Sequence, residues 1–176
     1  MQIGGIKEMT ILKNAVPILL GFALFFPGFL YGMQEEKEID AESYWYNVGL
    51  ERLQIVSETD TYLIVEVQAK HGRVLSKVRK DAVARLDFKA KAFKHVVREL
   101  IAWFNIDASE FSLSRLQTLT GERFVYPSAW NRWHEANADY FAWSERQGQF
   151  VVDEEAKKAK TPTELYRKTH PFAQPF

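Results

Sequence analysis

The chain has 176 residues, of which 47% are hydrophobic and 14% are aromatic. This length and composition are enough for one domain with a sizeable core, which excludes a disordered chain. Lysine and arginine together number 23, as do aspartate and glutamate. The formal net charge is therefore zero, which gives no reason to expect a nucleic-acid partner. The sequence has no cysteine, which suits an oxidising compartment.

The N-terminal region contains an uncharged segment from Ala15 to Met33. As a helix, this segment is long enough to cross a hydrocarbon core of about 30 Å. Its upstream flank is basic and its downstream flank is acidic, so the positive-inside rule places the rest of the chain outside, which in a bacterium is the periplasm. Pro27 and Gly32 also fit the end of a signal peptide. Residues 1–33 are thus predicted to be either a transmembrane anchor or a cleaved signal peptide.

Residues 34–42 form an acidic stretch that predicts a solvated linker, with ordered structure beginning near Ser43. Apolar positions from Tyr44 to Ile55 then lie on an arc that a helix could bury, and Asp40 or Ser43 could cap its start. We therefore expect a helix after the linker.

The next segment, residues 59–72, is ambiguous. Its β-branched run at 63–67 fits a strand, whereas the neighbouring apolar segments favour helices, and we interpret it as a helix that Gly72 ends. From Val74 onward, apolar residues recur every three or four positions over about 30 residues, which predicts helices with one buried stripe. The stripe consists of Leu75, Val78, Ala82, Leu86, Phe93, Val97, Leu100 and Phe104.

Short amphipathic helices that cannot bury their stripes alone are typical of stacked helix pairs. Three segments resemble the helices of bacterial HEAT-type repeats: VRKDAVARL (78–86), VVRELIAWF (96–104) and SLSRLQTLTG (112–121). The order of Leu119, Thr120, Gly121, Phe124, Pro127, Trp130 and Trp133 is similar to the terminal segment of many such proteins. The resemblance covers roughly residues 74–155 and departs from the pattern at Tyr126 and His134. It implies an all-α fold, a short HEAT-like helical solenoid over residues 43–137, and by itself no catalysis.

Two tryptophans, Trp130 and Trp133, follow Pro127 on one face of the predicted terminal helix. Together with Phe124 they are predicted to form a structural plug that covers the open end of the stack. The alternative is an aromatic platform for a sugar or a peptide, with Trp143 also lining the groove.

The C-terminal region is predicted to begin with a small β-hairpin over residues 138–152, with Gly148 in its turn, lying as a lid on the terminal helix. An extended tail over residues 153–176 follows, with one helical turn at DEEAKKA and another after the Thr-Pro pair. The last aromatic rings, Phe172 and Phe176, are expected either to pack along their own domain or to hook a neighbouring subunit.

A basic face is the first candidate contact surface. It is either an ordinary solvated helix surface or a docking site for an acidic partner or for anionic lipid headgroups beside the anchor. The residues assigned to it are Lys77, Arg79, Lys80, Arg85 and Lys89.

Sequence patterns for catalysis, metals and cofactors are absent. The four histidines are scattered, and there is no thiol, no metal-ligand spacing and no glycine-rich phosphate loop. His134 and Glu135 could pair as acid and base, but neighbours on a helix point apart. We therefore predict no catalytic, cofactor-binding or metal-binding residues.

The expected function is a non-catalytic protein-interaction or scaffold module on the periplasmic side of a membrane, an accessory subunit of a membrane protein complex. Its partners would be membrane protein subunits, and the membrane itself through residues 15–33 if they are retained. The alternative is a periplasmic ligand-binding module or hydrolase that uses an aromatic groove.

Overall fold

The computed structural model describes residues 37–171. These residues belong to the second of two compact units, which spans residues 36–176. The elements of the first half are β1 (Lys37–Glu38), α2 (Ala41–Gly49), β2 (Leu53–Glu58), β3 (Tyr62–Ala69), β4 (Gly72–Arg79), α3 (Lys80–Val83) and α4 (Leu86–Asp107). Those of the second half are α5 (Glu110–Thr120), α6 (Pro127–Asn137), the 3-10 turn η2 (Ala138–Tyr140), β5 (Phe141–Ser144), β6 (Gln149–Val152), α7 (Glu154–Lys158) and α8 (Thr163–Thr169).

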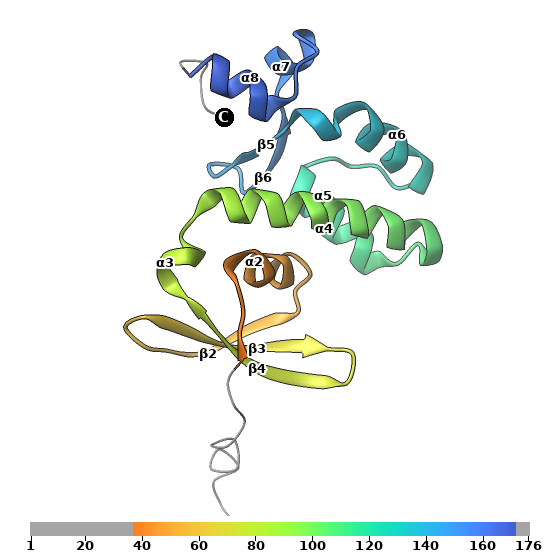
Figure 1. Ribbon diagram of the computed structural model, residues 1–176. Coiled ribbons are helices and arrows are strands. Elements are labelled where there is room, and N and C mark those ends of the chain that lie inside the picture. Colours follow the sequence, from red (N-terminus) through yellow and green to blue (C-terminus); the bar gives the residue numbers. More distant parts are fainter. Residues whose placement is uncertain (1–36, 172–176) are drawn as a thin grey trace, which may run out of the picture. The chain divides into compact units, whose positions relative to one another are not determined.

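The predicted all-α fold is wrong, because the described residues form a mixed α/β structure. A four-stranded sheet has the order β1-β4-β3-β2, and β5 and β6 form a separate hairpin. In the larger sheet β1 runs parallel to β4, and the other neighbours are antiparallel. A HEAT-like solenoid over residues 43–137 is thereby excluded, since this range contains β2, β3 and β4. Figure 1 shows α2 lying between the sheet and α4.

Helix α2 begins directly after Asp40, one of its two predicted caps, and ends earlier than predicted. The Asp40 side chain accepts a hydrogen bond of 2.7 Å from the Ser43 amide, so Asp40 is the N-cap. At Gly49, an added Cβ would lie 2.9 Å from Cγ2 of Val96, so the glycine permits close approach of α2 to α4. The chain then turns into a strand at Leu53, which removes the second half of the predicted helix.

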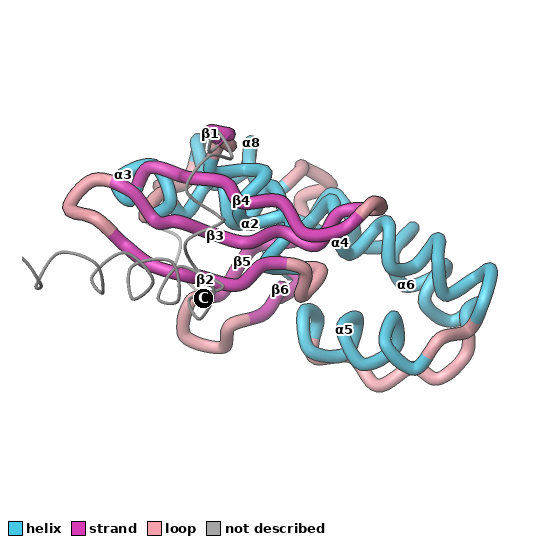
Figure 2. Tube along the Cα trace, turned by 90° about the horizontal axis from the view of Figure 1, so that it is seen from below, coloured by secondary structure: helices cyan, strands magenta, loops and turns pink. Residues whose placement is uncertain are grey.

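The predicted helices between residues 59 and 79 are wrong, because these residues form the hairpin of β3 and β4. The pairing runs from Tyr62 with Arg79 to Ala69 with Gly72, whose φ of +126° suits the turn. Because side chains alternate along a strand, Val78 is buried against α2, whereas Leu75 lies on the opposite face of the sheet. The two residues were predicted to share one helix face. Figure 2 shows β3 and β4 in front of α2.

The predicted acidic linker is also wrong over its described part. Lys37 and Glu38 pair with Ser76 and Lys77 of β4, and α2 already starts at Ala41. Acidic composition therefore did not prevent these residues from joining the sheet.

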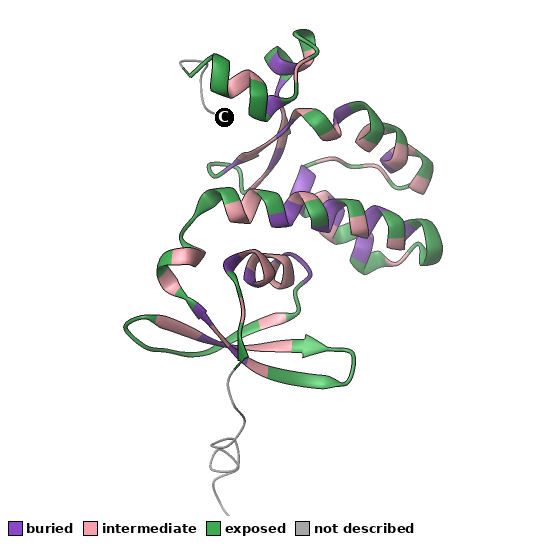
Figure 3. Cartoon of the chain, viewed as in Figure 1, coloured by how far each residue is buried: buried purple, intermediate pink, exposed green. Residues whose placement is uncertain are grey.

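The helical half of the prediction is confirmed in α4, whose buried stripe includes Phe93, Val97, Leu100 and Phe104. This stripe is the centre of the larger hydrophobic core, together with residues from α5, α6 and the hairpin. Helix α5 ends at Gly121 in the left-handed conformation, with φ of +72°. Figure 3 shows the buried residues concentrated where α4 meets its neighbours.

The predicted hairpin is present as β5 and β6, with Gly148 at φ +64° in its turn. The two helical turns predicted in the tail are present, as α7 within DEEAKKA and as α8 directly after the Thr161–Pro162 pair, so the described part of the tail is helical and not extended. Asp153 caps α7 and also pairs with Arg167 of α8, which fixes the two short helices together. No helix within residues 37–171 is long and apolar enough to span a membrane. The predicted N-terminal anchor or signal peptide, as well as Phe172 and Phe176, lies outside the described residues.

Candidate binding surfaces

Four large apolar side chains are exposed at one end of the helical layer. Ile106 lies in the last turn of α4, Phe111 in the first turn of α5, and Val125 and Tyr126 directly before α6. Their exposed fractions are 85% for Ile106, 42% for Phe111, 56% for Val125 and 70% for Tyr126. We call these four residues the apolar end patch.

Two side-chain hydrogen bonds join the α4 and α6 segments of the apolar end patch. The side chains of Asn105 and Asn131 exchange two bonds of 3.1 and 3.0 Å, which join the end of α4 to α6. The backbone oxygen of Tyr126 accepts from the amide of Trp130, so Tyr126 lies in the turn next to this link. Figure 1 shows the end of α4 and the start of α6 on the same side of the molecule. A cluster of large exposed apolar residues is typical of a contact site for another protein.

The five residues of the predicted basic face do not share a helix surface. Lys77 and Arg79 lie on β4, Lys80 begins α3, Arg85 precedes α4, and Lys89 is in α4. Each has an internal partner: the Tyr62 ring for Lys77 (5.4 Å), Asp81 for Arg79 (2.9 Å), Glu58 for Lys80 (3.0 Å), Asp87 for Arg85 (3.2 Å) and Glu145 for Lys89 (3.2 Å). Their role in binding a partner stays a prediction, and they do not form one uncompensated cationic surface.

Lys89 has the most developed internal contacts of the five. Its ammonium lies 5.0 Å from the ring centroids of both Trp45 and Trp143 and pairs with Glu145. Because Trp45 belongs to α2 and Trp143 to β5, Lys89 links the two layers that pack on α4. Its first role is therefore structural.

The predicted aromatic plug lies in the core. Trp130 is fully buried, and its Nε1 donates to the backbone oxygen of Phe124 at 3.2 Å. Its ring meets those of Phe124 and Trp133 edge to face, at centroid distances of 5.3 and 5.7 Å. Trp133 is half-buried and donates from Nε1 to Glu122. There is no solenoid end to close, and the cluster instead packs α6 against the hairpin through Phe141.

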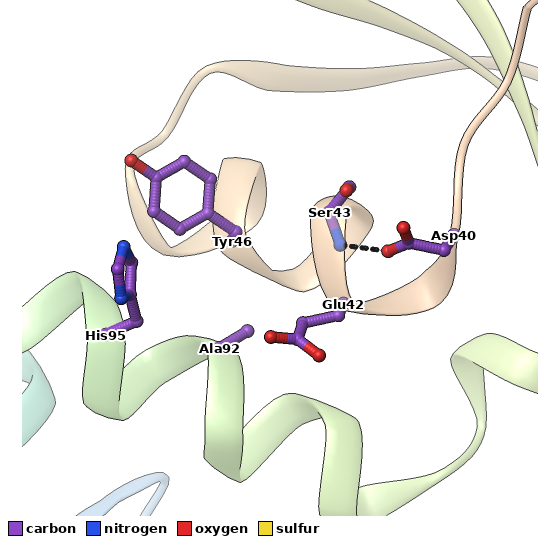
Figure 4. Close-up of a pocket in the computed structure, with 6 residues that line it drawn as sticks. All are labelled: Asp40, Glu42, Ser43, Tyr46, Ala92 and His95. Atoms are coloured by element: carbon purple, nitrogen blue, oxygen red, sulfur yellow. Dashed lines mark hydrogen bonds between the residues drawn. The ribbon is translucent and has the colours of Figure 1, made fainter.

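A cavity of about 420 Å³ lies between the start of α2 and the middle of α4 (Figure 4). Its lining consists of Asp40, Glu42, Ser43, Tyr46, Ala92 and His95. Figure 4 shows the Tyr46 and His95 rings on one side and the two carboxylates on the other. Both carboxylates are already engaged, Asp40 as the cap of α2 and Glu42 with Lys91 at 2.8 Å.

A chain of hydrogen bonds runs along the His95 side of this cavity. Nη2 of Arg98 lies 2.9 Å from Nδ1 of His95, whose Nε2 lies 3.1 Å from Glu99. Because a guanidinium can only donate, Nδ1 must accept and Nε2 must carry the proton given to Glu99. The other Glu99 oxygen accepts from the Tyr46 hydroxyl at 2.5 Å. Burial raises the pKa of Tyr46 to about 12, and the hydrogen bond to Glu99 and its charge act in the same direction.

A second cavity, of about 330 Å³, lies between α4 and α6. Its lining consists of Glu42, Lys91, Lys94, His95, Arg98, His134, Ala138 and Phe141. We call its five basic side chains, Lys91, Lys94, His95, Arg98 and His134, the basic groove. Burial lowers the pKa of His134, and the positive charge of Arg98 lowers it further, against the opposing effect of Glu135 and Asp139.

Sequence reasoning missed the basic groove because it judged the histidines by their separation along the chain. His95 and His134 line one cavity only because α6 packs beside α4. A signal was nevertheless present, since positions 91, 94, 95 and 98 recur at helical spacing on one face of α4.

No family model, curated protein or solved structure matches the chain. These comparisons do not test the resemblance to HEAT-type repeat proteins, which stays a prediction. The all-α fold that it implied is wrong.

Proposed function

We propose that the chain is a non-catalytic interaction module on the outer, periplasmic face of a membrane, where it serves as an accessory subunit of a membrane protein complex. The observation that carries this proposal is the apolar end patch. Burial of apolar surface contributes a favourable free energy of roughly 25 cal/mol per Å². The four large exposed side chains at one end of the helical layer therefore favour association with a complementary surface.

The location rests on the sequence of the N-terminal segment. An uncharged run from Ala15 to Met33, with a basic flank before it and an acidic flank after it, supports a retained anchor and a periplasmic body. An anchor confines the module to the membrane, where its first available partners are other membrane proteins. This argument selects a membrane protein subunit as the partner of the apolar end patch.

The alternative function, a ligand-binding module or hydrolase with an aromatic groove, is less well supported. Trp130 has no exposed surface, and the indole N–H groups of Trp133 and Trp143 are bonded to Glu122 and Glu145. An aromatic platform needs ring faces that a ligand can reach. Edge-to-face contacts with neighbouring rings occupy much of that surface.

The experiment that tests the proposal is purification of the tagged full-length protein from its native membranes in mild detergent, with mass spectrometry of the intact chain and its companions. The test variant carries Ile106→Lys and Tyr126→Lys, which place two charges in the apolar end patch. The matched control is Leu165→Lys, because Leu165 is a similarly exposed apolar residue, 55% exposed, on α8.

We expect the unaltered protein to retain its N-terminal segment and to carry a stoichiometric membrane protein. The patch variant should lose that companion by about tenfold or more, since desolvating a lysine at an apolar contact costs well over 1.4 kcal/mol. The Leu165 variant should retain it. A soluble chain trimmed near Gly32 and purified alone would contradict the proposal and favour the ligand-binding alternative.

A further inference from the structure

Beyond docking to a partner, the structure contains a concave site with converging cations. The basic groove lies between α4 and α6 and shares no residue with the apolar end patch. Its cavity of about 330 Å³ falls within the range of roughly 300 to 1,000 Å³ that small-molecule sites occupy. Side chains from α2, α4, α6, η2 and β5 line it, so the site depends on tertiary packing and not on one helix alone.

Arg98 lines the groove and is held by a hydrogen bond to a neighbouring side chain. One of its N–H groups is bonded to Nδ1 of His95, whose opposite nitrogen is anchored on Glu99. A guanidinium has five N–H donors, so four remain for a ligand. Within residues 37–171, Arg98 forms no ion pair with a carboxylate. A fixed guanidinium with free donors is suited to bidentate binding of a phosphate or carboxylate.

Two lysines flank Arg98 along the same helix face. Lys91 pairs with Glu42 at 2.8 Å and Lys94 with Glu164 at 3.5 Å. These pairs are solvent-exposed, and exposed ion pairs contribute little, so a ligand can compete with either carboxylate. Three cations around one cavity favour a dianion over a single carboxylate.

The remaining walls fit an organic group attached to the anion. Ala138 and the ring of His134 supply apolar surface, and the buried Phe141 lies beside His134 at a centroid distance of 6.0 Å. The acidic groups near His134 are Glu135 and Asp139, and their effect on it is outweighed by burial and by Arg98. The groove therefore combines a cationic wall with an apolar one.

From these observations we propose that the basic groove binds the phosphate group of a small soluble phosphate monoester, with Arg98 as the bidentate donor and Lys91 and Lys94 as flanking cations. His95 is a positioning residue that orients Arg98. Most anionic lipid headgroups also carry phosphate, but as a diester with a single charge, whereas three cations suit the dianion of a monoester.

The test uses the full-length protein in a non-ionic detergent, with glycerol phosphate as the soluble probe and vesicles containing phosphatidylglycerol as the lipid probe. Binding is measured by calorimetry, and the ring signals of His134 are followed by NMR over a pH titration. We expect saturable binding of glycerol phosphate and a rise in the pKa of His134 when it is bound, because the phosphate compensates the charge of Arg98.

Arg98→Gln should weaken glycerol phosphate binding by about tenfold or more and should raise the pKa of His134 even without ligand. The matched control is Arg73→Gln, which removes the same charge from β4 and should change binding less than twofold, within about 0.4 kcal/mol. Unsaturable binding, equal loss in both variants, or binding to vesicles alone would each overturn the proposal. None of these results depends on the membrane partner of the apolar end patch.

Discussion

Replacement of Trp130 with alanine is expected to be among the most destabilising substitutions in the chain. The indole is fully buried, meets Phe124 and Trp133 edge to face, and donates a hydrogen bond to the backbone of Phe124. Removing a buried tryptophan typically costs about 3–5 kcal/mol. We expect the upper half of this range, roughly 4 kcal/mol, because the change also removes two ring contacts and the hydrogen bond to the partly buried carbonyl of Phe124.

A second tryptophan provides the matched control. Trp103 on α4 is only partly buried, and its main polar contact is the guanidinium of Arg52 at 5.1 Å from the ring centroid. Trp103→Ala should therefore cost about 1–2 kcal/mol, from partial loss of burial and of the cation–π contact.

The free energy of unfolding can be measured by pulse proteolysis of the full-length protein in increasing urea, in mild detergent. The two variants should differ by at least about 2 kcal/mol, which is a large part of a typical domain stability of about 5–15 kcal/mol. Equal costs for Trp130→Ala and Trp103→Ala would refute the conclusion that Trp130 is a core residue. Such equality would instead favour an exposed aromatic platform.

Three further predictions use the same unfolding assay or a titration. Gly49→Ala should lower the free energy of unfolding by about 1–2 kcal/mol, because the steric cost of the alanine Cβ against α4 exceeds the gain in helix propensity. Asp153→Asn keeps the cap of α7 but removes the buried charge that pairs with Arg167 at 2.8 Å, and should cost about 3 kcal/mol, whereas a cost near zero would show that the pair is dispensable. The raised pKa of Tyr46 means that its contribution to stability is present below pH 10 and is lost as the pH rises through about 12. An alkaline absorbance titration should therefore lose one late tyrosine step in Tyr46→Phe, and an unchanged curve would contradict the assignment.

The sequence predicted the helical half of the fold because α4 is long. Over 22 residues, a period of 3.6 cannot be mistaken for a period of two, and the stripe from Phe93 to Phe104 is indeed buried. Local signals at the ends of elements were equally informative. Asp40 caps α2, and Gly121 ends α5 in the left-handed conformation.

The strands were missed because short apolar runs fit both periods. Val74 and Val78 are four residues apart, which places them on one face of a helix and equally on one face of a strand. What decides between the two is the pairing of β4 with β3 and the cover that α2 gives to Val65 and Val78. Such long-range contacts override the local pattern, and only the β-branched run at 63–67 pointed to a strand.

The candidate surfaces were harder to predict, because exposure depends on the tertiary fold. Ile106 lies in the last turn of α4, two residues after the buried Phe104 and therefore off the buried stripe, but the helical period alone does not show whether another element covers that side. The basic groove likewise needs α6 beside α4 to bring His134 to Arg98. The aromatic cluster around Trp130 was easier to predict, because two tryptophans on one face of a helix that starts with a proline indicate that this face is packed.

The most direct test of the proposed function is photo-crosslinking from position 106 in intact native membranes. A photoreactive amino acid replaces Ile106 in the full-length chain, and a second chain carries it at Leu165 on α8 as the control. The account predicts one dominant crosslink from position 106 to a membrane protein and none of comparable yield from position 165. Equal, diffuse labelling from both positions, or crosslinks from neither, would contradict the assignment of the apolar end patch as the docking surface.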